Sequence, residues 1–176
     1  MAGLERVRFM VVDDNAHMIN IVKTILRGFG ATQIFEAKDA VDAFHRLKHD
    51  SIDLVITDYQ MEVLDGIEFI KLIRNSSDSP NRYVPIIMLT AHSERSRVTQ
   101  SRDVGANEFC CKPVTASEMY RKVQAIVDYP RPFIKTQAYF GPDRRRHNDS
   151  KYEGPERRHG WSADHKPPRN RATDAA

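Results

Sequence analysis

The chain contains only two cysteines, Cys110 and Cys111, and they are neighbours in the sequence. Neighbouring cysteines exclude a disulfide-rich framework and lack the spacing of a zinc site, so we interpret them as small thiols on a strand. No stretch approaches the ~18 apolar residues that a transmembrane helix needs. The opening residues mix charges into a short apolar run, which is unlike a secretory signal. These absences predict a cytoplasmic protein.

Glycine-rich nucleotide-binding motifs are also missing from the 176 residues. Neither a P-loop nor the turn of a dinucleotide-binding domain is present, which argues against the enzymes that depend on those turns. The remaining composition is ordinary for a folded domain, because 40% of the residues are hydrophobic and 29% are charged.

Charge and proline are distributed unevenly along the chain. Residues 1–128 carry 16 basic and 18 acidic side chains, whereas residues 129–176 carry 11 basic and 6 acidic ones. Six of the nine prolines also lie in the second part. We therefore predict a folded domain over residues 1–128 and a basic, Pro/Arg-rich, disordered tail over residues 129–176.

Hydrophobic periodicity alternates between the pattern of buried strands and that of amphipathic helices. Short apolar runs predict strands within 7–14, 32–37, 52–57, 84–90 and 107–112. Apolar residues three or four positions apart predict intervening helices, the last one capped by Thr115 or Ser117. Segment 93–106 has the length of a helix but few large apolar residues. This alternation predicts an α/β fold with a parallel sheet covered by helices on both faces.

Polar side chains follow four of the predicted strands where each strand ends. They are Asp13 and Asp14 after the first strand, Asp58 after the third, Thr90 after the fourth and Lys112 after the fifth. Ligands of such sheets bind outside the carboxyl ends of the strands, so we expect these side chains to share one edge. An aspartate after a strand is also a common turn residue. For Asp58 alone both interpretations stay open, but the joint placement favours a site.

The types of these side chains suit phosphoryl chemistry. Clustered carboxylates repel one another unless a cation lies among them, and oxygen ligands without His or Cys favour a hard cation. A partial shell that leaves room for water and phosphate suits Mg²⁺ better than Ca²⁺. An aspartate beside such a cation can act as a nucleophile toward phosphorus. Mg²⁺, Lys112 and the Thr90 hydroxyl would then neutralise the phosphoryl oxygens.

The motifs VVDD, DYQMEVLDG, IIMLTA and CKP, in this order, resemble the receiver domain of two-component response regulators. The resemblance covers residues 5–128. It implies a doubly wound, flavodoxin-like fold of parallel strands in the order 2-1-3-4-5. It also implies a stand-alone phosphoacceptor of a phosphorelay, which catalyses only its own phosphorylation and dephosphorylation.

The same resemblance implies which residues carry out the phosphorylation. Asp58 would accept the phosphoryl group, and Mg²⁺ would be held by Asp13, Asp14, Asp58 and the backbone carbonyl of Gln60. A histidine kinase or a histidine phosphotransfer protein would supply the phosphoryl group. A haloacid-dehalogenase-like phosphatase is disfavoured, because that family has Asp-x-Asp after its first strand and this strand ends in Asp-Asp-Asn.

The resemblance also implies which residues respond to the phosphoryl group. Thr90 and Lys112 would contact it, Phe109 would be the switch aromatic, and the peptide bond before Pro113 would be cis. The surface of the fourth helix, fifth strand and fifth helix would then signal to a downstream protein partner.

The motif departs from the common pattern in the loop after Asp58. Met61 and Glu62 replace the usual Met-Pro, which changes the stiffness of the loop more than its chemistry. Gln60 and His92 occupy variable positions, where we interpret them as tuning the rate of dephosphorylation; the alternative is that they are loop residues without effect.

The tail contains a near-repeat, YFGPDRRRH at 139–147 and YEGPERRHG at 152–160. One interpretation is a solvated, disordered tail. The duplication also suits binding to an acidic protein surface or to nucleic acid, which would make the chain a nucleic-acid-binding regulator controlled by the receiver. The anchors would be Arg144, Arg145, Arg146, Arg157 and Arg158.

Overall fold

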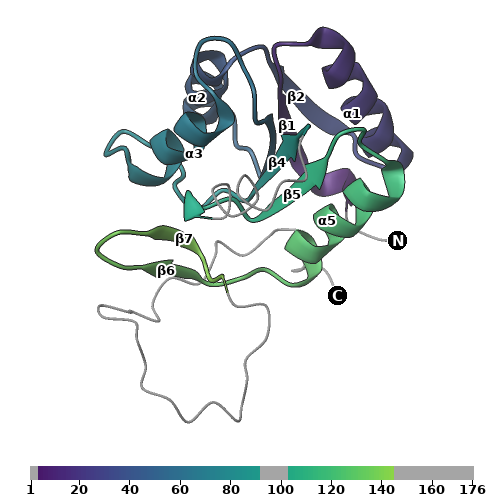
Figure 1. Ribbon diagram of the computed structural model, residues 1–176. Helices are drawn as coiled ribbons and strands as arrows, with labels where there is room; N and C mark the ends of the chain where they lie inside the picture. The colour runs from purple at the N-terminus through teal and green to yellow at the C-terminus, as the bar shows by residue number, and fades with distance from the viewer. Residues whose placement is uncertain (1–3, 92–102, 145–176) are drawn as a thin grey trace.

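A parallel five-stranded sheet forms the centre of the protein in the computed structural model, which describes residues 4–91 and 103–144 (Figure 1). The strands stand in the order β2-β1-β3-β4-β5, and every neighbouring pair is parallel. This confirms the predicted fold and strand order. The strands are β1 Arg8–Val12, β2 Gln33–Ala37, β3 Leu54–Asp58, β4 Ile86–Thr90 and β5 Glu108–Cys111.

The helices begin where the sequence supplies a capping side chain. Asn15, Asp39, Asp65 and Thr115 each accept a hydrogen bond from a backbone N–H of the following turn, which satisfies a donor that has no partner inside the helix. Thr115, rather than Ser117, is therefore the cap of the last helix. A short 3-10 helix, η1 Leu4–Arg6, precedes β1, and the α-helices are α1 Ala16–Gly28, α2 Ala40–His49, α3 Gly66–Asn75 and α5 Ala116–Asp128.

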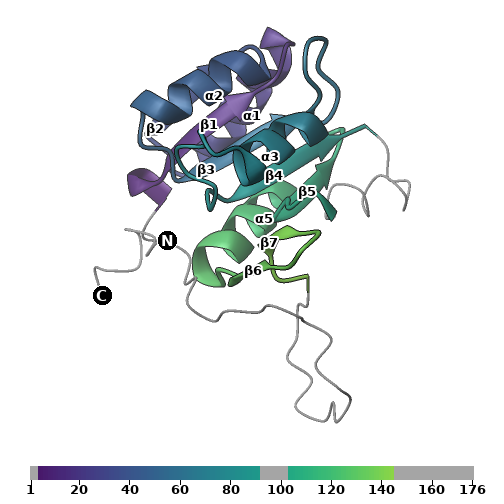
Figure 2. The same cartoon turned by 90° about the vertical axis from the view of Figure 1, so that its left-hand side faces the viewer.

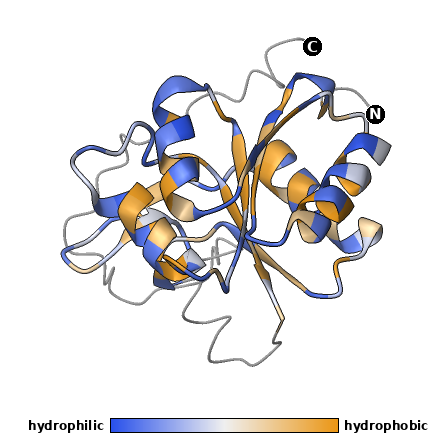
Figure 3. Ribbon diagram, turned by 90° about the horizontal axis from the view of Figure 1, so that it is seen from above, coloured by the Kyte–Doolittle hydropathy of each residue, from blue (hydrophilic) through white to orange (hydrophobic). Residues whose placement is uncertain are grey.

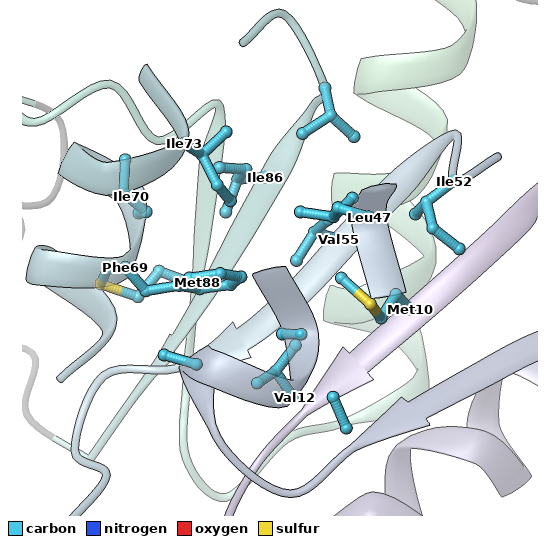
Figure 4. Packing of buried hydrophobic residues seen from close by; sticks show 14 of the residues in the cluster. Met10, Val12, Leu47, Ile52, Val55, Phe69, Ile70, Ile73, Ile86 and Met88 are labelled. Carbon is cyan, nitrogen blue, oxygen red and sulfur yellow. The ribbon is translucent and has the colours of Figure 1, made fainter. Parts of the chain in front are cut away.

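The helices divide between the two faces of the sheet, so that each face has its own core (Figure 3). The strands are apolar on both faces because successive side chains point to opposite sides and both sides are covered. On one face α2 and α3 pack against Met10, Val55 and Met88 (Figure 4). On the other face α1 and α5 pack against Phe9, Ile56 and Cys110.

The helix expected within 93–106 lies mostly outside the described residues. Residues 1–3 and 145–176 lie entirely outside them. In the described part, no helix is both long enough and apolar enough to span a bilayer.

The chain continues past α5 into an ordered hairpin, which corrects the expectation of disorder from residue 129. Strands β6 Phe133–Lys135 and β7 Phe140–Pro142 pair antiparallel beside the end of α5 (Figure 2). Phe133, Ile134 and Phe140 are buried. The strands are only three residues long and dock through aromatic rings and arginines, so they leave no periodic apolar pattern in the sequence. The near-repeat after residue 144, with four of the five proposed anchors, lies outside the described residues.

Candidate functional site at the carboxyl ends of the strands

The register of the sheet places Asp13 and Asp58 side by side. Val12 pairs with Thr57 across the two central strands, and each aspartate is the next residue along its own strand. Asp13 is 1% exposed and Asp58 is 6% exposed, so both carboxylates are withdrawn from water. Hydrogen bonds fix each one, from Asn15 N–H to Asp13 Oδ1 (2.8 Å) and from Tyr59 N–H to Asp58 Oδ1 (2.8 Å).

Lys112 joins the two carboxylates from the end of β5. Its Nζ lies 2.9 Å from Asp58 Oδ1 and 3.3 Å from Asp13 Oδ2. The Lys112 N–H donates to the Thr90 carbonyl (2.7 Å), which ties this residue to the end of β4. The Lys112–Pro113 peptide bond is cis, as the resemblance implied. The ammonium group is thus held between two buried anions.

Burial and charge act in opposite directions on this cluster. Burial raises the pKa of Asp58 above its usual range, and Lys112 offsets only part of that rise, while the neighbouring Asp13 adds to it. Burial alone would lower the pKa of Lys112, but its hydrogen bond and attraction to Asp58, together with Asp13, raise it. The lysine therefore stays charged at neutral pH, whereas ionised Asp58 is incompletely compensated.

Thr90 and Phe109 occupy the neighbouring strand ends. Thr90 is buried and pairs with Cys111, the residue before Lys112. Phe109 is partly exposed on β5, and the Lys122 ammonium lies 4.9 Å from the centre of its ring. The structure therefore brings Asp13, Asp58, Thr90 and Lys112 to one edge, while Phe109 lies further back along β5.

The sequence profile of the response regulator receiver domain matches residues 9–124 of the chain. The chain belongs to the response regulator receiver family. Receiver domains are signalling domains of two-component systems rather than classical enzymes, and phosphorylation is characteristic of them. They interact with histidine kinases and with downstream targets.

Several relatives of this receiver are chemotaxis proteins. The chain is 32% identical over 124 residues to the chemotaxis protein CheY-3 of Vibrio cholerae, covering 70% of this chain and 94% of the relative. It is 30% identical over 121 residues to the CheY of Pseudomonas aeruginosa, covering 69% of this chain and 96% of the relative. The solved structure of Vibrio cholerae CheY4 superposes with a TM-score of 0.62 at 26% identity, covering 68% of this chain and 98% of that one.

The donors at this receiver's site suit a magnesium ion in type but do not converge on one point. Asp14 is exposed, and its Oδ2 accepts a hydrogen bond from Glu62 N–H (3.2 Å). Gln60 is exposed in the same loop. Over residues 4–91 and 103–144, no three His, Cys, Asp or Glu side chains are close enough to hold a metal. Oxygen donors of this kind are nonetheless the type of ligand that a hard cation binds.

Gly66 supports the strand end that carries Asp58. A Cβ atom at this position would lie 2.3 Å from the Asp58 carbonyl oxygen, which is closer than atoms can approach. The Gly66 N–H donates to the Tyr59 carbonyl (2.9 Å), so the start of α3 closes tightly over the loop after β3. The glycine in the DG motif is needed for this close approach.

Arg74 is a buried residue that the sequence analysis missed. Its side chain is fully buried at the other end of the sheet, where it donates to the Gly105 carbonyl from Nε (3.1 Å) and Nη2 (3.0 Å). Burial lowers its pKa to about 9, so the guanidinium remains charged at neutral pH. A signal was present, because position 74 continues the buried spacing of Ile67 and Ile70 along α3.

Proposed function

We propose that this receiver accepts a phosphoryl group on Asp58 and transmits that event to a downstream protein. The observation that carries the proposal is the pairing of buried Asp58 with Asp13 under a single ammonium, Lys112 at 2.9 Å. Such a carboxylate is held in place for attack, and its charge is incompletely neutralised before the reaction.

Phosphoryl transfer here exchanges one bond to phosphorus for another. An Asp58 carboxylate oxygen forms the new P–O bond, and the bond from phosphorus to the donor's histidine nitrogen, or to the acyl oxygen of a small donor, breaks. Lys112 stays within reach of the added negative charge, and the Thr90 hydroxyl is the neighbouring hydrogen-bonding group. Hydrolysis of the acyl phosphate by water restores the carboxylate and releases phosphate.

Asp13, Asp14, Asp58 and the Gln60 carbonyl are the groups that would hold Mg²⁺. When bound, the ion supplies positive charge to the phosphoryl oxygens. The chain's own contribution is to keep Asp13 fixed by Asn15 N–H and to keep Lys112 charged. Receiver domains of this type use Mg²⁺.

The response would pass through Thr90 and Phe109 to the surface that includes β5 and α5. Gln60, and His92 in the part of the chain outside the described residues, would tune the rate of dephosphorylation. A histidine kinase or a histidine phosphotransfer protein would act as the donor. The partner that reads the surface would be a protein.

Phosphorylation with acetyl phosphate and Mg²⁺, followed by intact mass, tests the assignment. We expect wild type to gain one acid-labile, hydroxylamine-sensitive phosphoryl group and Asp58→Asn to gain none. Asp78→Asn removes an exposed loop aspartate and serves as the matched control, with labelling like wild type. Full labelling of Asp58→Asn at another side chain would overturn the proposal.

A second proposal concerns the basic tail. Residues 129–176 carry 11 basic against 6 acidic side chains, which suits an anionic partner, either an acidic protein surface or nucleic acid. Retention of the full chain on DNA or RNA that falls steeply with salt, compared with residues 1–144, would support nucleic acid. Equal retention of both would refute it.

A further inference from the structure

The hairpin rests on the segment 103–108 that leads into β5. The Arg144 guanidinium lies 3.2 Å from Asp103 Oδ1. Gly141 lies directly against Gly105, since a Cβ on Gly141 would approach Gly105 Cα to 2.8 Å. Gly105 has φ of +104°, a conformation that side chains disfavour. The hairpin therefore holds this segment by its backbone as well as by charge.

A carboxylate on β5 joins the base of the hairpin to α5. Arg131 donates to the carbonyls of Asn107 and Asp143, the latter at 3.1 Å. The same guanidinium lies 3.6 Å from Glu108 Oε1, and Lys122 of α5 lies 2.9 Å from Glu108 Oε2. Glu108 is buried between these two cations. A shift of β5 would therefore disturb the contacts that dock the hairpin.

The same strand leads to the candidate phosphorylation site. Phe109 follows Glu108, and Lys122 lies over its ring at 4.9 Å. Lys112 follows the last residue of β5 and pairs with Asp58. β5 thus begins with Glu108, which contacts the hairpin, and leads four residues later to Lys112, which contacts Asp58.

The surface that the hairpin contacts, around Arg74 and Arg82, favours weak docking. Phe133 covers the buried guanidinium of Arg74 at 5.0 Å, and Arg82 stacks on Phe140 at 4.3 Å. Within the described residues, the hydrogen-bond partners of Arg74 are neutral oxygens, among them the Gly105 carbonyl. Burying a cation without a carboxylate costs free energy, and this cost offsets the apolar gain. The three-residue strands form a two-stranded sheet separate from the five-stranded one, so the hairpin can detach without unfolding the main sheet.

We propose that the hairpin, residues 130–144, is an intramolecular latch that is docked in the unphosphorylated receiver and released when Asp58 is loaded. This inference rests on the proposed function. Loading draws Lys112 toward the added charge and shifts β5 away from the position in which Glu108 and Gly105 fit the hairpin. Release frees Arg144, and with it the start of the basic tail, for an anionic partner.

Hydrogen exchange on the full chain tests the release. The probes are the amides of Thr136 and Asp143, which donate to the carbonyls of Tyr139 and Pro132 (both 2.8 Å). Exchange is measured with and without Mg²⁺ and beryllium fluoride, which is a tetrahedral analogue of the phosphoryl group. We expect loading to speed exchange at these amides at least about five-fold, the lower end of typical coupling between sites. Asp58→Asn should show no change. Unchanged or slower exchange in loaded wild type overturns the latch.

The second test uses the reverse coupling: if loading of Asp58 releases the hairpin, then undocking the hairpin must favour loading. Gly141→Ala places a methyl group against both Gly105 and the Tyr139 hydroxyl and so disfavours docking of the hairpin. This variant should bind beryllium fluoride more tightly than wild type, by up to the same factor. Phe140→Ala is a second undocking variant, in case Gly141→Ala folds poorly. Lys135→Ala, on the exposed side of the hairpin, is the matched control and should bind like wild type. Equal affinity in all three variants overturns the coupling.

The two proposals fail in different ways. If wild type binds neither beryllium fluoride nor phosphate at Asp58, the proposed function fails and the latch falls with it. If wild type loads normally but the Thr136 and Asp143 amides exchange at an unchanged rate, only the latch fails. If the latch holds, Glu108→Gln should reduce the effect of loading on exchange, because it removes the charge between Arg131 and Lys122.

Discussion

The two ends of the sheet both bury charge, but they compensate it in different ways. At the carboxyl ends, Asp13 and Asp58 share the ammonium of Lys112. At the opposite end, the guanidinium of Arg74 is surrounded by carbonyl oxygens, the Asn107 side chain and the ring of Phe133. The first arrangement leaves excess negative charge and attracts a cation or responds to a phosphoryl group. The second gives each nitrogen of the guanidinium a neutral oxygen acceptor, but no carboxylate is among these acceptors in the described residues.

This difference determines where loss of a side chain is costly. Arg74 crosslinks α3 to the Gly105 carbonyl and to the Arg82 carbonyl, so it acts as a structural clamp. The side chains of Asp58 and Lys112 hold each other, and changing one of them alters charge more than connectivity. Substitutions at the two ends should therefore differ in size and even in sign.

The largest effect is expected at Arg74. Arg74→Ala would remove the donor to the Gly105 and Arg82 carbonyls and open a cavity under Phe133. Asn107 Oδ1 would lose one donor and keep the Ile86 N–H. The free energy of unfolding should fall by about 3–5 kcal/mol. Arg46→Ala, which removes a half-exposed guanidinium paired with Asp42, is the control and should cost less than about 0.5 kcal/mol. Urea denaturation measures both, and equal losses would contradict the clamp.

The next largest change in stability is expected at one of two glycines that lie at helix ends, Gly66 at the start of α3 and Gly28 at the end of α1. Gly66→Ala would drive a methyl group into the Asp58 carbonyl, and overpacking of this kind costs about 1–3 kcal/mol. Gly28→Ala meets nothing within 4 Å at the end of α1 and should stabilise the helix by about 0.5 kcal/mol. Thermal unfolding of both variants decides this, and a neutral Gly66→Ala would show that α3 shifts freely.

Substitutions of Asp58 and Lys112 should change the free energy of unfolding in opposite directions. Because burial raises the pKa of Asp58, the native protein binds its proton more tightly, and stability falls as pH rises from the ordinary carboxyl pKa of about 4 through the raised value. Asp58→Asn should therefore stabilise the unphosphorylated protein at pH 7, with the gain vanishing at low pH.

Lys112→Met should destabilise at the same pH, because the pKa of Lys112 is raised and its contribution persists until high pH. Denaturation curves of both variants at several pH values check these signs. A destabilising Asp58→Asn at pH 7 would mean that Lys112 compensates the carboxylate fully.

The sequence predicted which polar side chains gather at one edge of the sheet, because strand ends carry their polar residues one position past an apolar run. Asp13, Asp58 and Lys112 follow from that rule once the sheet is known to be parallel. The direction of the Asp14 side chain does not follow, since it depends on the Glu62 N–H in a loop after another strand. The hairpin was missed because Phe133 and Phe140 pack on arginines from distant parts of the chain rather than on a periodic partner.

The smallest effect is expected at Arg144, where the hairpin meets Asp103. Both side chains are about two-fifths exposed (39% and 43%), so solvent screens the pair and its loss should cost less than about 1 kcal/mol of global stability. The guanidinium also stacks on the Tyr139 ring at 4.2 Å, which is a contact within the hairpin. Arg144→Ala should therefore leave the unfolding midpoint nearly unchanged while speeding exchange at the Asp143 amide. Arg144→Lys keeps the charge and much of the ion pair, and it should restore part of that protection. A fall in global stability as large as that of Arg74→Ala would contradict weak docking, because it would mean that the hairpin is an inseparable part of the sheet's core.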